Sequence, residues 1–254
     1  MEKNPFDAMA HLYDLMVPWE SRLSREEPFY RKVFGLPGKR ILDAACGTGR
    51  HALLFHSFGH AVTATDLSEA ALTVAKKHAA SQGSELKFVR ENLLSLEGSF
   101  GEDSFDFLTI LGNSLAQFKE AEALTGIFRG AAAILAPGGT LLFQIVNFHT
   151  LTVREGRFMP LRVVRDGERE LLFQKIFEFC GSLVVLDVLI FAKRGSQWER
   201  HAESTVLRPW SREELEPLLM ENGFAGVSWY GDFSFAPFER ETSKDLIAVA
   251  KVPH

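Results

Sequence analysis

Between residues 40 and 147, short apolar runs alternate with longer segments in which apolar residues recur at helical spacing. Strands and helices that alternate in this way are typical of β-α-β units joined into a mostly parallel sheet. Pro137, Gly138 and Gly139 are expected to stop the last helix and turn the chain into the strand that follows. We expect strands at residues 40–43, 60–66, 86–90, 105–111 and 140–147, and helices at 50–58, from the N-cap Ser68 to Ala80, and at 119–135.

The pattern changes between residues 162 and 207, where four strand-like stretches follow one another without a helix. The pairs between them favour hairpin turns and so predict an antiparallel meander: Asp166-Gly167, Gly181-Ser182 and Gly195-Ser196. A capping box at 211–214 then begins a helix to about Asn222 that Gly223 ends, and strands at 225–230 and 246–252 follow. The predicted fold class is α/β: a Rossmann-like, doubly wound, seven-stranded, mostly parallel sheet with an antiparallel β-meander inserted after strand five.

Composition excludes several functions. The 254 residues suffice for one substantial core, and a net charge of −5 offers no attraction to phosphate backbones or anionic lipid. We therefore expect neither nucleic acid nor a membrane as partner, and interpret Arg162, Arg165 and Arg169 as a solvated face. Two cysteines, no apolar run of 18 residues and no signal-peptide pattern indicate a cytoplasmic protein. The histidines at 51, 56 and 60 are too loosely spaced to predict a metal site.

A glycine loop, Asp43-Ala44-Ala45-Cys46-Gly47-Thr48-Gly49, joins the first expected strand to its helix. Glycines let the backbone approach a ligand closely, and the N–H groups at the start of the helix favour an anionic group. With Ala52 the loop also satisfies the G-x-G-x-x-G/A pattern of dinucleotide binding, and Asp66 stands near the position that contacts ribose. An NAD-dependent oxidoreductase is therefore one alternative.

Asp43 distinguishes between two kinds of ligand, because its carboxylate comes directly before the loop. It would repel a pyrophosphate, whereas it would attract the ammonium group of S-adenosylmethionine. That molecule also carries a carboxylate, a sulfonium and a ribose diol, which suit the mixture of backbone donors and acids in this region. A purely structural alternative stays open, in which Asp43 caps the next helix and the glycines serve only the turn.

The chain resembles class I S-adenosylmethionine-dependent methyltransferases across residues 35–150 and 208–252. The resemblance lies in the motif at 43–49, Asp66, the run Leu135-Ala136-Pro137-Gly138-Gly139 and the late helix-strand-strand order. Ala45 stands where those enzymes usually carry the first glycine, a departure that a small side chain should tolerate. A narrower resemblance is to the glycine/sarcosine N-methyltransferase branch and its small-molecule relatives. It lies in the run Leu111-Gly112-Asn113-Ser114-Leu115-Ala116, in Asn92 and in Asn147. Where glycine N-methyltransferase carries an arginine for its substrate's carboxylate, this chain has Val146, so glycine is not the expected acceptor.

The resemblance implies S-adenosyl-L-methionine as cofactor and a role for each matching residue. The glycine loop would pack its backbone against the methionine part, Asp66 would accept the ribose hydroxyls, and Leu111 would lie beside the sulfonium. Leu67 would lie against adenine, with Asn92 and Leu93 at its edge, although both leucines are open to an interpretation as plain core. The expected cofactor-binding residues are Tyr13, Arg22, Asp43, Ala45, Gly47, Gly49, Asp66, Leu67, Asn92, Leu93 and Leu111.

The N-terminal residues Tyr13 and Arg22 match an aromatic and an arginine that, in such enzymes, fold over the cofactor, with the arginine holding its carboxylate. A surface aromatic and a solvated charge are the alternatives for these two positions. The implied organisation is an N-terminal helical lid at 1–34, a cofactor-binding α/β core at 35–150, a β insertion over the acceptor site at 151–208, and the rest of the core at 209–254.

The implied reaction is methyl transfer by in-line displacement to nitrogen or oxygen of a small molecule, which needs alignment more than catalytic side chains. Transfer to an oxygen acceptor can require a general base. The catalytic candidates are Asn113, whose amide can orient the acceptor, and the titratable His149 and Tyr230. The alternatives are a helix-capping role for Asn113 and a loop or capping role for His149. Four phenylalanines of the insertion are expected either to roof an apolar acceptor site or to fill core: Phe173, Phe177, Phe179 and Phe191. A non-enzymatic S-adenosylmethionine-binding protein is the remaining alternative.

Overall fold

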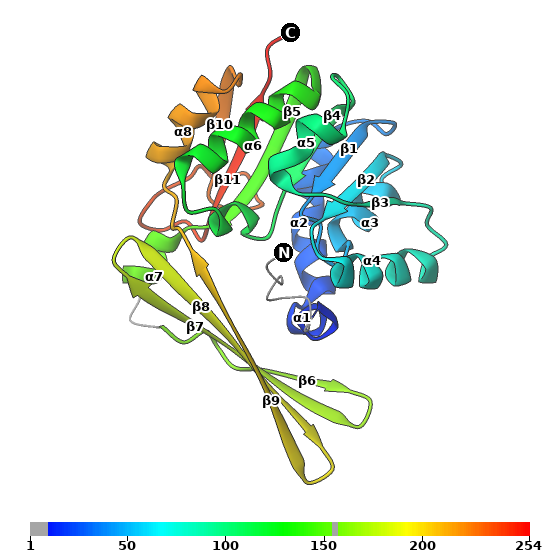
Figure 1. Ribbon diagram of the computed structural model, residues 1–254, viewed down its shortest axis with the longest axis vertical. Helices are drawn as coiled ribbons and strands as arrows, with labels where there is room; N and C mark the ends of the chain where they lie inside the picture. The colour runs from blue at the N-terminus through cyan, green and yellow to red at the C-terminus, as the bar shows by residue number, and fades with distance from the viewer. Residues whose placement is uncertain (1–9, 154–156) are drawn as a thin grey trace.

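A computed structural model describes residues 10–153 and 157–254. At its centre is a seven-stranded sheet with the strand order β10-β11-β5-β4-β1-β2-β3 (Figure 1). Strand β11 runs antiparallel to both of its neighbours, β10 and β5, and the other pairs of this sheet are parallel. This arrangement confirms the predicted fold class. The strands are β1 (Arg40–Ala44), β2 (Ala61–Asp66), β3 (Lys87–Arg90), β4 (Phe105–Ile110), β5 (Leu135–Val146), β10 (Gly226–Tyr230) and β11 (Asp245–Lys251).

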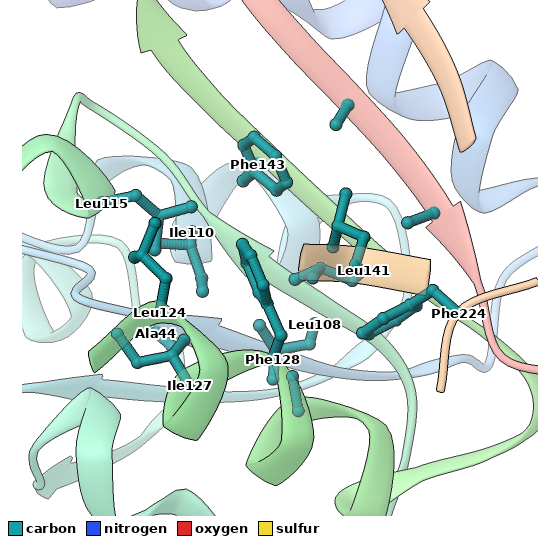
Figure 2. Close-up of a cluster of buried hydrophobic side chains, with 14 of the residues drawn as sticks. Ala44, Leu108, Ile110, Leu115, Leu124, Ile127, Phe128, Leu141, Phe143 and Phe224 are labelled. Atoms are coloured by element: carbon teal, nitrogen blue, oxygen red, sulfur yellow. The ribbon is translucent and has the colours of Figure 1, made fainter. Parts of the chain in front are cut away.

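Helices cover both faces of the sheet, because successive side chains of a strand point to opposite faces. Leu42 and Ala44 of β1 pack with α6 and α8, whereas Ile41 packs with α2 and α3. Figure 2 shows the first of these cores, in which the rings of Phe128 and Phe143 are stacked with centroids 5.9 Å apart. The covering helices are α2 (Trp19–Phe34), α3 (Arg50–Ser57), α4 (Glu69–Ser81), α6 (Ala121–Ile134) and α8 (Arg212–Glu221).

Strand β5 begins five residues earlier than the sequence indicates, and this part of the prediction was wrong. Pro137, Gly138 and Gly139 lie inside the strand instead of before it. The pairing of β4 with β5 shifts between Phe105 and Phe107, so the extra residues of β5 form a bulge. The bulge is held by the end of the chain, since Gly138 N–H donates to the Pro253 carbonyl at 3.1 Å. Gly138 has a φ of +72°, which favours glycine there.

The predicted meander is confirmed as a separate four-stranded antiparallel sheet in the order β6-β7-β8-β9. Its turns contain Gly167, Gly181 and Gly195, which have φ values of 60°, 62° and 60°. Phe177 and Leu207 attach this sheet to the α/β core through Ala116 and Phe148. Figure 1 shows the sheet extending away from the α/β layers. Its strands are β6 (Arg162–Asp166), β7 (Arg169–Cys180), β8 (Leu183–Arg194) and β9 (Gln197–Leu207).

Short helices complete the described chain. The first, α1 (Ala10–Met16), packs Leu12 and Met16 against Leu171 and Phe173 of the meander. The predicted caps are confirmed: Ser68 accepts from the Ala71 N–H, and Ser211 and Glu214 form the capping box of α8. No helix within residues 10–153 and 157–254 is long and apolar enough to span a membrane. The others are η2 (Leu93–Ser95), α5 (Leu96–Ser99), η3 (Ser114–Gln117) and α7 (Phe148–Val153).

Candidate functional site

A cavity of about 580 Å³ lies at the carboxyl edge of the parallel strands, where ligands bind in open α/β sheets. Residues from the glycine loop, from α1 and α2 and from the meander line it together. Of the expected cofactor-binding residues, all but Gly49 line this cavity: Tyr13, Arg22, Asp43, Ala45, Gly47, Asp66, Leu67, Asn92, Leu93 and Leu111. The fold therefore gathers residues that are up to 98 positions apart in the sequence around one cavity.

The glycine loop contains three residues in the left-handed backbone region. Ala45, Gly47 and Gly49 have φ values of 57°, 56° and 75°. At Gly47 an added Cβ would meet no atom within 4 Å, so its backbone borders open space in the cavity. At Gly49 the same atom would lie 2.9 Å from Cβ of Ala75, so this glycine permits close packing of the loop against α4. Gly49 is thus both the N-cap residue of α3 and a packing residue.

Asp43 is a buried carboxylate with one unpaired oxygen. Its Oδ1 accepts a hydrogen bond of 2.7 Å from Thr109 Oγ1, whereas its Oδ2 is buried without a partner among the described residues. Burial raises the pKa of Asp43 to about 6, against the opposing effects of His51 and of the Thr109 hydrogen bond. A structural role beside α3 accompanies any binding role, because the backbone N–H of Ala52 in the first turn of α3 also acts on this carboxylate and lowers its pKa, although Gly49 is the N-cap residue of that helix. A buried, half-satisfied carboxylate at the wall of a cavity suits a cationic ligand group.

Asp66 is held in place by backbone donors from two loops. Its Oδ2 accepts from Gly47 N–H at 2.7 Å and its Oδ1 accepts from Ser68 N–H at 2.8 Å. A carboxylate oxygen can accept more than one hydrogen bond, so donors of a ligand can still reach this group. Leu67 is 49% exposed and lines the cavity, which rules out the plain-core interpretation for this residue.

Asn92 and Leu93 have structural contacts in addition to their place in the cavity wall. Asn92 Oδ1 accepts from Leu94 N–H at 3.0 Å and so caps η2. Leu93 is buried and belongs to the core beneath α6. The plain-core interpretation of Leu93 and its lining of the cavity are therefore both correct.

Helix α2 contributes a buried ion-pair network to the cavity wall. Arg22 Nε donates to Glu26 Oε1 at 2.8 Å, and Tyr30 and His51 bond Glu26 Oε2 at 3.0 and 2.8 Å. Burial raises the pKa of Glu26, but His51 and Arg22 outweigh it and bring the pKa down to about 2. Arg22 is thus an anchored side chain instead of a solvated charge. The spacing of four residues from Arg22 to Glu26 and from Glu26 to Tyr30 is the signal that sequence reasoning missed.

A second polar cluster joins α1 to the glycine loop. Asp14, which is buried, accepts from Thr48 Oγ1 at 2.7 Å and from Arg50 Nη2 at 2.6 Å. His78 of α4 lies 3.5 Å from the same carboxylate. Because α1 also packs against the meander, Asp14 links the glycine loop to the wall opposite it. The sequence places Thr48 in the glycine loop, but it does not single out Asp14, Arg50 or His78.

The catalytic candidates are placed very differently. Asn113 lines the cavity, and its Oδ1 accepts from Val146 N–H at 3.0 Å instead of capping η3. His149 Nε2 lies 2.7 Å from Glu241 Oε2, and His149 does not border the cavity. Tyr230 packs edge-on against Phe29 and Phe235, also away from the cavity. Of the three candidates, only Asn113 lines the cavity.

The far end of the cavity is built by the meander, β5 and β11. Of the four phenylalanines considered above, Phe177 lines it, and Phe173 is buried in the core between α1 and the meander. The polar side chains there include Gln144 and Asp245, which hydrogen-bond each other at 2.7 Å. Sequence reasoning did not single out either residue.

Comparisons with known proteins agree with this geometry. A family model described as a methyltransferase domain matches residues 41–139. A putative methyltransferase of Geobacillus sp. (strain WCH70) is 29% identical over 252 residues, which are 94% of this chain and 99% of that protein. The putative methyltransferase YqeM of Bacillus subtilis is 30% identical over 194 residues, 74% of this chain and 75% of that protein. The glycine/sarcosine N-methyltransferase of Aphanothece halophytica is 25% identical over 245 residues, 94% and 86% of the two chains.

Solved structures share the whole architecture. A S-adenosylmethionine-dependent methyltransferase from Clostridium acetobutylicum has a TM-score of 0.78 at 20% identity and covers 99% of this chain and 100% of its own. A sugar N-methyltransferase from Streptoalloteichus has a TM-score of 0.74 at 16% identity, with 95% and 93% covered. The chain belongs to the class I S-adenosylmethionine-dependent methyltransferases. It is an enzyme that uses S-adenosylmethionine, and the alternative of an NAD-dependent oxidoreductase finds no support.

Proposed function

We propose that the protein transfers a methyl group to nitrogen or oxygen of a small molecule that binds in the cavity beside the cofactor. The observation that carries this proposal is the unpaired, buried Oδ2 of Asp43 next to the open backbone of Gly47, at one end of a cavity with space beyond it. The volume of about 580 Å³ is within the range of small-molecule sites. Two similar proteins are named as methyltransferases of glycine or sarcosine and of a sugar, which are small molecules.

In this proposal the cofactor occupies the end of the cavity formed by β1, β2 and β3. Asp43 binds the ammonium group, the backbone at Ala45 and Gly47 borders the methionine part, and Arg22 meets the carboxylate. Asp66 accepts the ribose hydroxyls, while Leu67, Asn92 and Leu93 surround adenine. When bound, the cofactor supplies an electrophilic methyl group on a sulfonium. Leu111, at the end of β4, then borders the place of transfer.

The protein's own contribution to the reaction is alignment. Asn113 follows β4, and its carbonyl oxygen is bound by Val146 N–H, which directs the amide so that its NH2 group is left to orient the acceptor. Residues 10–34 and 157–207 cover the cavity in this proposal, as lid and as roof of the acceptor site. The lid assigned to residues 1–34 includes residues 1–9, and the roof at 151–208 includes 154–156, which lie outside the described residues.

Calorimetry with S-adenosylhomocysteine tests the cofactor site. Asp66→Ala is expected to weaken binding by about 1 to 3 kcal/mol, because two hydroxyls lose a charged acceptor. Glu69→Ala is the matched control: Glu69 lies in the first turn of α4, is exposed, and does not line the cavity. Equal affinities of the two variants would contradict the ribose role of Asp66.

Transfer of a radiolabelled methyl group from S-adenosylmethionine tests the acceptor class. The panel contains amines, phenols and carboxylates of increasing size, with glycine included as an expected non-substrate because Val146 offers no charge for its carboxylate. Labelling of at least one small compound supports the proposal, provided that the rate of methyl transfer at subsaturating cofactor is much lower in Asp66→Ala than in wild type. Labelling of protein or RNA substrates alone, with none in the panel, would overturn it.

A further inference from the structure

Asp245 brings a carboxylate to the functional edge of the sheet from an unusual direction. It is the first residue of β11, and because β11 runs antiparallel to β5, its start lies beside the end of β5, opposite Val146. The carboxyl edge of the parallel strands therefore receives an acid from the beginning of a strand. Asp245 lines the cavity and is only partly buried.

Gln144 holds this carboxylate in a defined orientation. The amide of Gln144 is 5% exposed; its Nε2 donates to Asp245 Oδ1 at 2.7 Å, and its Oε1 accepts from Gly112 N–H at 3.1 Å. Gly112 lies between Leu111 and Asn113 in the loop that follows β4. Two hydrogen bonds thus connect Asp245 to the loop that borders the proposed place of transfer.

The charges around Asp245 act on it from a distance: Arg22 and Arg25 lower its pKa, and Glu26 raises it. Helix α2 presents Glu26, Arg22 and Arg25 toward it. Arg22 forms an ion pair with Glu26, with 2.8 Å between Nε and Oε1, and the side chain of Arg25 is 71% exposed. Across the described ranges, no salt bridge reaches Asp245. Burial raises the pKa of Asp245, and the Gln144 hydrogen bond lowers it in part.

Of the other acids of the cavity wall, Glu26 is paired with Arg22 and His51, and the remaining three belong to the opposite end. Asp43, Asp66 and Glu91 follow β1, β2 and β3, where the cofactor is proposed to bind. Near Asp245 the wall contributed by the meander is apolar at Phe177 and Leu207, with Lys175 on the same sheet. An acceptor at this end therefore meets one fixed anionic group and an apolar roof.

We propose that Asp245 binds the nitrogen of the acceptor, so that the substrate is an amine attached to an apolar body. This inference rests on the proposed function and narrows its acceptor to nitrogen. The lone pair of the neutral amine forms the new N–C bond while the C–S bond breaks and its electron pair stays on sulfur. Positive charge passes from sulfur to nitrogen, where the carboxylate of Asp245 stabilises it, and the methylated ammonium then gives one proton to water.

Asp245→Asn removes the charge and keeps an oxygen that can accept from Gln144. Asp187→Asn is the matched control, since Asp187 follows the cavity-lining Leu186 on β8 and points to the other face of that strand. Both variants are assayed for radiolabelled methyl transfer to alkyl and aralkyl amines and to phenols and carboxylates of the same size. Asp245→Asn should lower kcat/KM for amines by about tenfold or more, because a charge-assisted contact is lost.

Affinity for S-adenosylhomocysteine, measured by calorimetry, should stay within about twofold for both variants, since Asp245 lies outside the proposed cofactor end. Asp245→Ser provides a second test if Asp245→Asn has a lowered melting temperature. Unchanged amine kinetics in a folded Asp245 variant would overturn the inference. Wild-type enzyme that methylates phenols or carboxylates but no amine would overturn it too, while the proposed function would stand; a panel without any labelled compound would refute both.

Discussion

The two ends of the cavity are built in different ways. At the cofactor end, Asp43 and Asp66 lie at the ends of the neighbouring strands β1 and β2, and Asp66 is bound by backbone N–H groups of the loops that follow these strands, as in the bond from Gly47 N–H. At the acceptor end, Gln144 and Asp245 are 101 residues apart and meet through the pairing of β5 with β11. Local sequence determines the first arrangement, whereas the second exists only after the sheet has formed.

This difference has a consequence for how each end can change. The cofactor end depends on a few backbone conformations that only small residues adopt readily, so most substitutions there disturb the loop itself. The acceptor end consists of side chains on rigid strands and on the meander, so a substitution there changes the shape or charge of the site while the fold is kept. A class of enzymes with one cofactor and many acceptors is consistent with such a division.

Gly49→Ala is expected to give the largest effect, at the cofactor end. The left-handed φ of +75° costs about 1 to 2 kcal/mol for alanine, and the contact of 2.9 Å with Cβ of Ala75 adds about 1 to 3 kcal/mol of overpacking. Urea unfolding should therefore show a loss of about 2 to 5 kcal/mol. Gly83→Ala is the control, because Gly83 follows the end of α4 with a φ of +63° and has open space around its Cβ position.

If the two glycine variants lose equal stability, the packing of the loop against α4 does not matter, and the constraint on the cofactor end is backbone conformation alone. A greater loss in Gly49→Ala would show that the loop is also positioned by the contact with Ala75 and Phe88.

The pH dependence of stability is the second test, and it concerns Asp43. Its pKa in the folded protein, about 6, is above the ordinary value of 3.8, so the folded state binds the proton more tightly. This stabilisation is complete below pH 3.8 and is lost as pH rises through 6, which leaves a cost of up to about 3 kcal/mol at neutral pH. Asp43→Asn should therefore gain stability relative to wild type as pH rises from 4 to 7.

Thermal unfolding of Asp43→Asn, wild type and Asp106→Asn over this pH range provides the measurement. Asp106 is the control with the opposite sign, because its hydrogen bond with Arg40 lowers the pKa of Asp106. Saturating S-adenosylmethionine should reduce the difference between Asp43→Asn and wild type, since its ammonium compensates the buried charge. Parallel pH curves for all three proteins would refute an unfavourable buried charge at Asp43.

The same division explains which parts of the structure the sequence predicts. The strands, the caps at Ser68 and Ser211 and the glycine loop depend on neighbours in the chain, and local patterns identify them. The start of β5 was placed wrongly because its bulge depends on Pro253, which lies more than a hundred residues away. Asp245 escaped notice for a related reason: residues at the ends of strands were considered, but only the antiparallel direction of β11 brings the start of a strand to that edge.

The smallest expected effect is at the acceptor end, in the meander. Phe177 and Phe173 lie four residues apart on the same face of β7, but Phe177 lines the cavity and Phe173 is buried against α1. Phe177→Leu and Phe173→Leu should each cost less than about 1.5 kcal/mol of stability. Only Phe177→Leu should alter the ratio of kcat/KM between a small and a large acceptor, in favour of the large one, because it shortens the roof above the site. The affinity for S-adenosylhomocysteine should be the same in both variants. If Phe173→Leu changes the acceptor preference as much as Phe177→Leu does, the meander acts on the reaction through the fold as a whole, and not through the side chain that borders the acceptor.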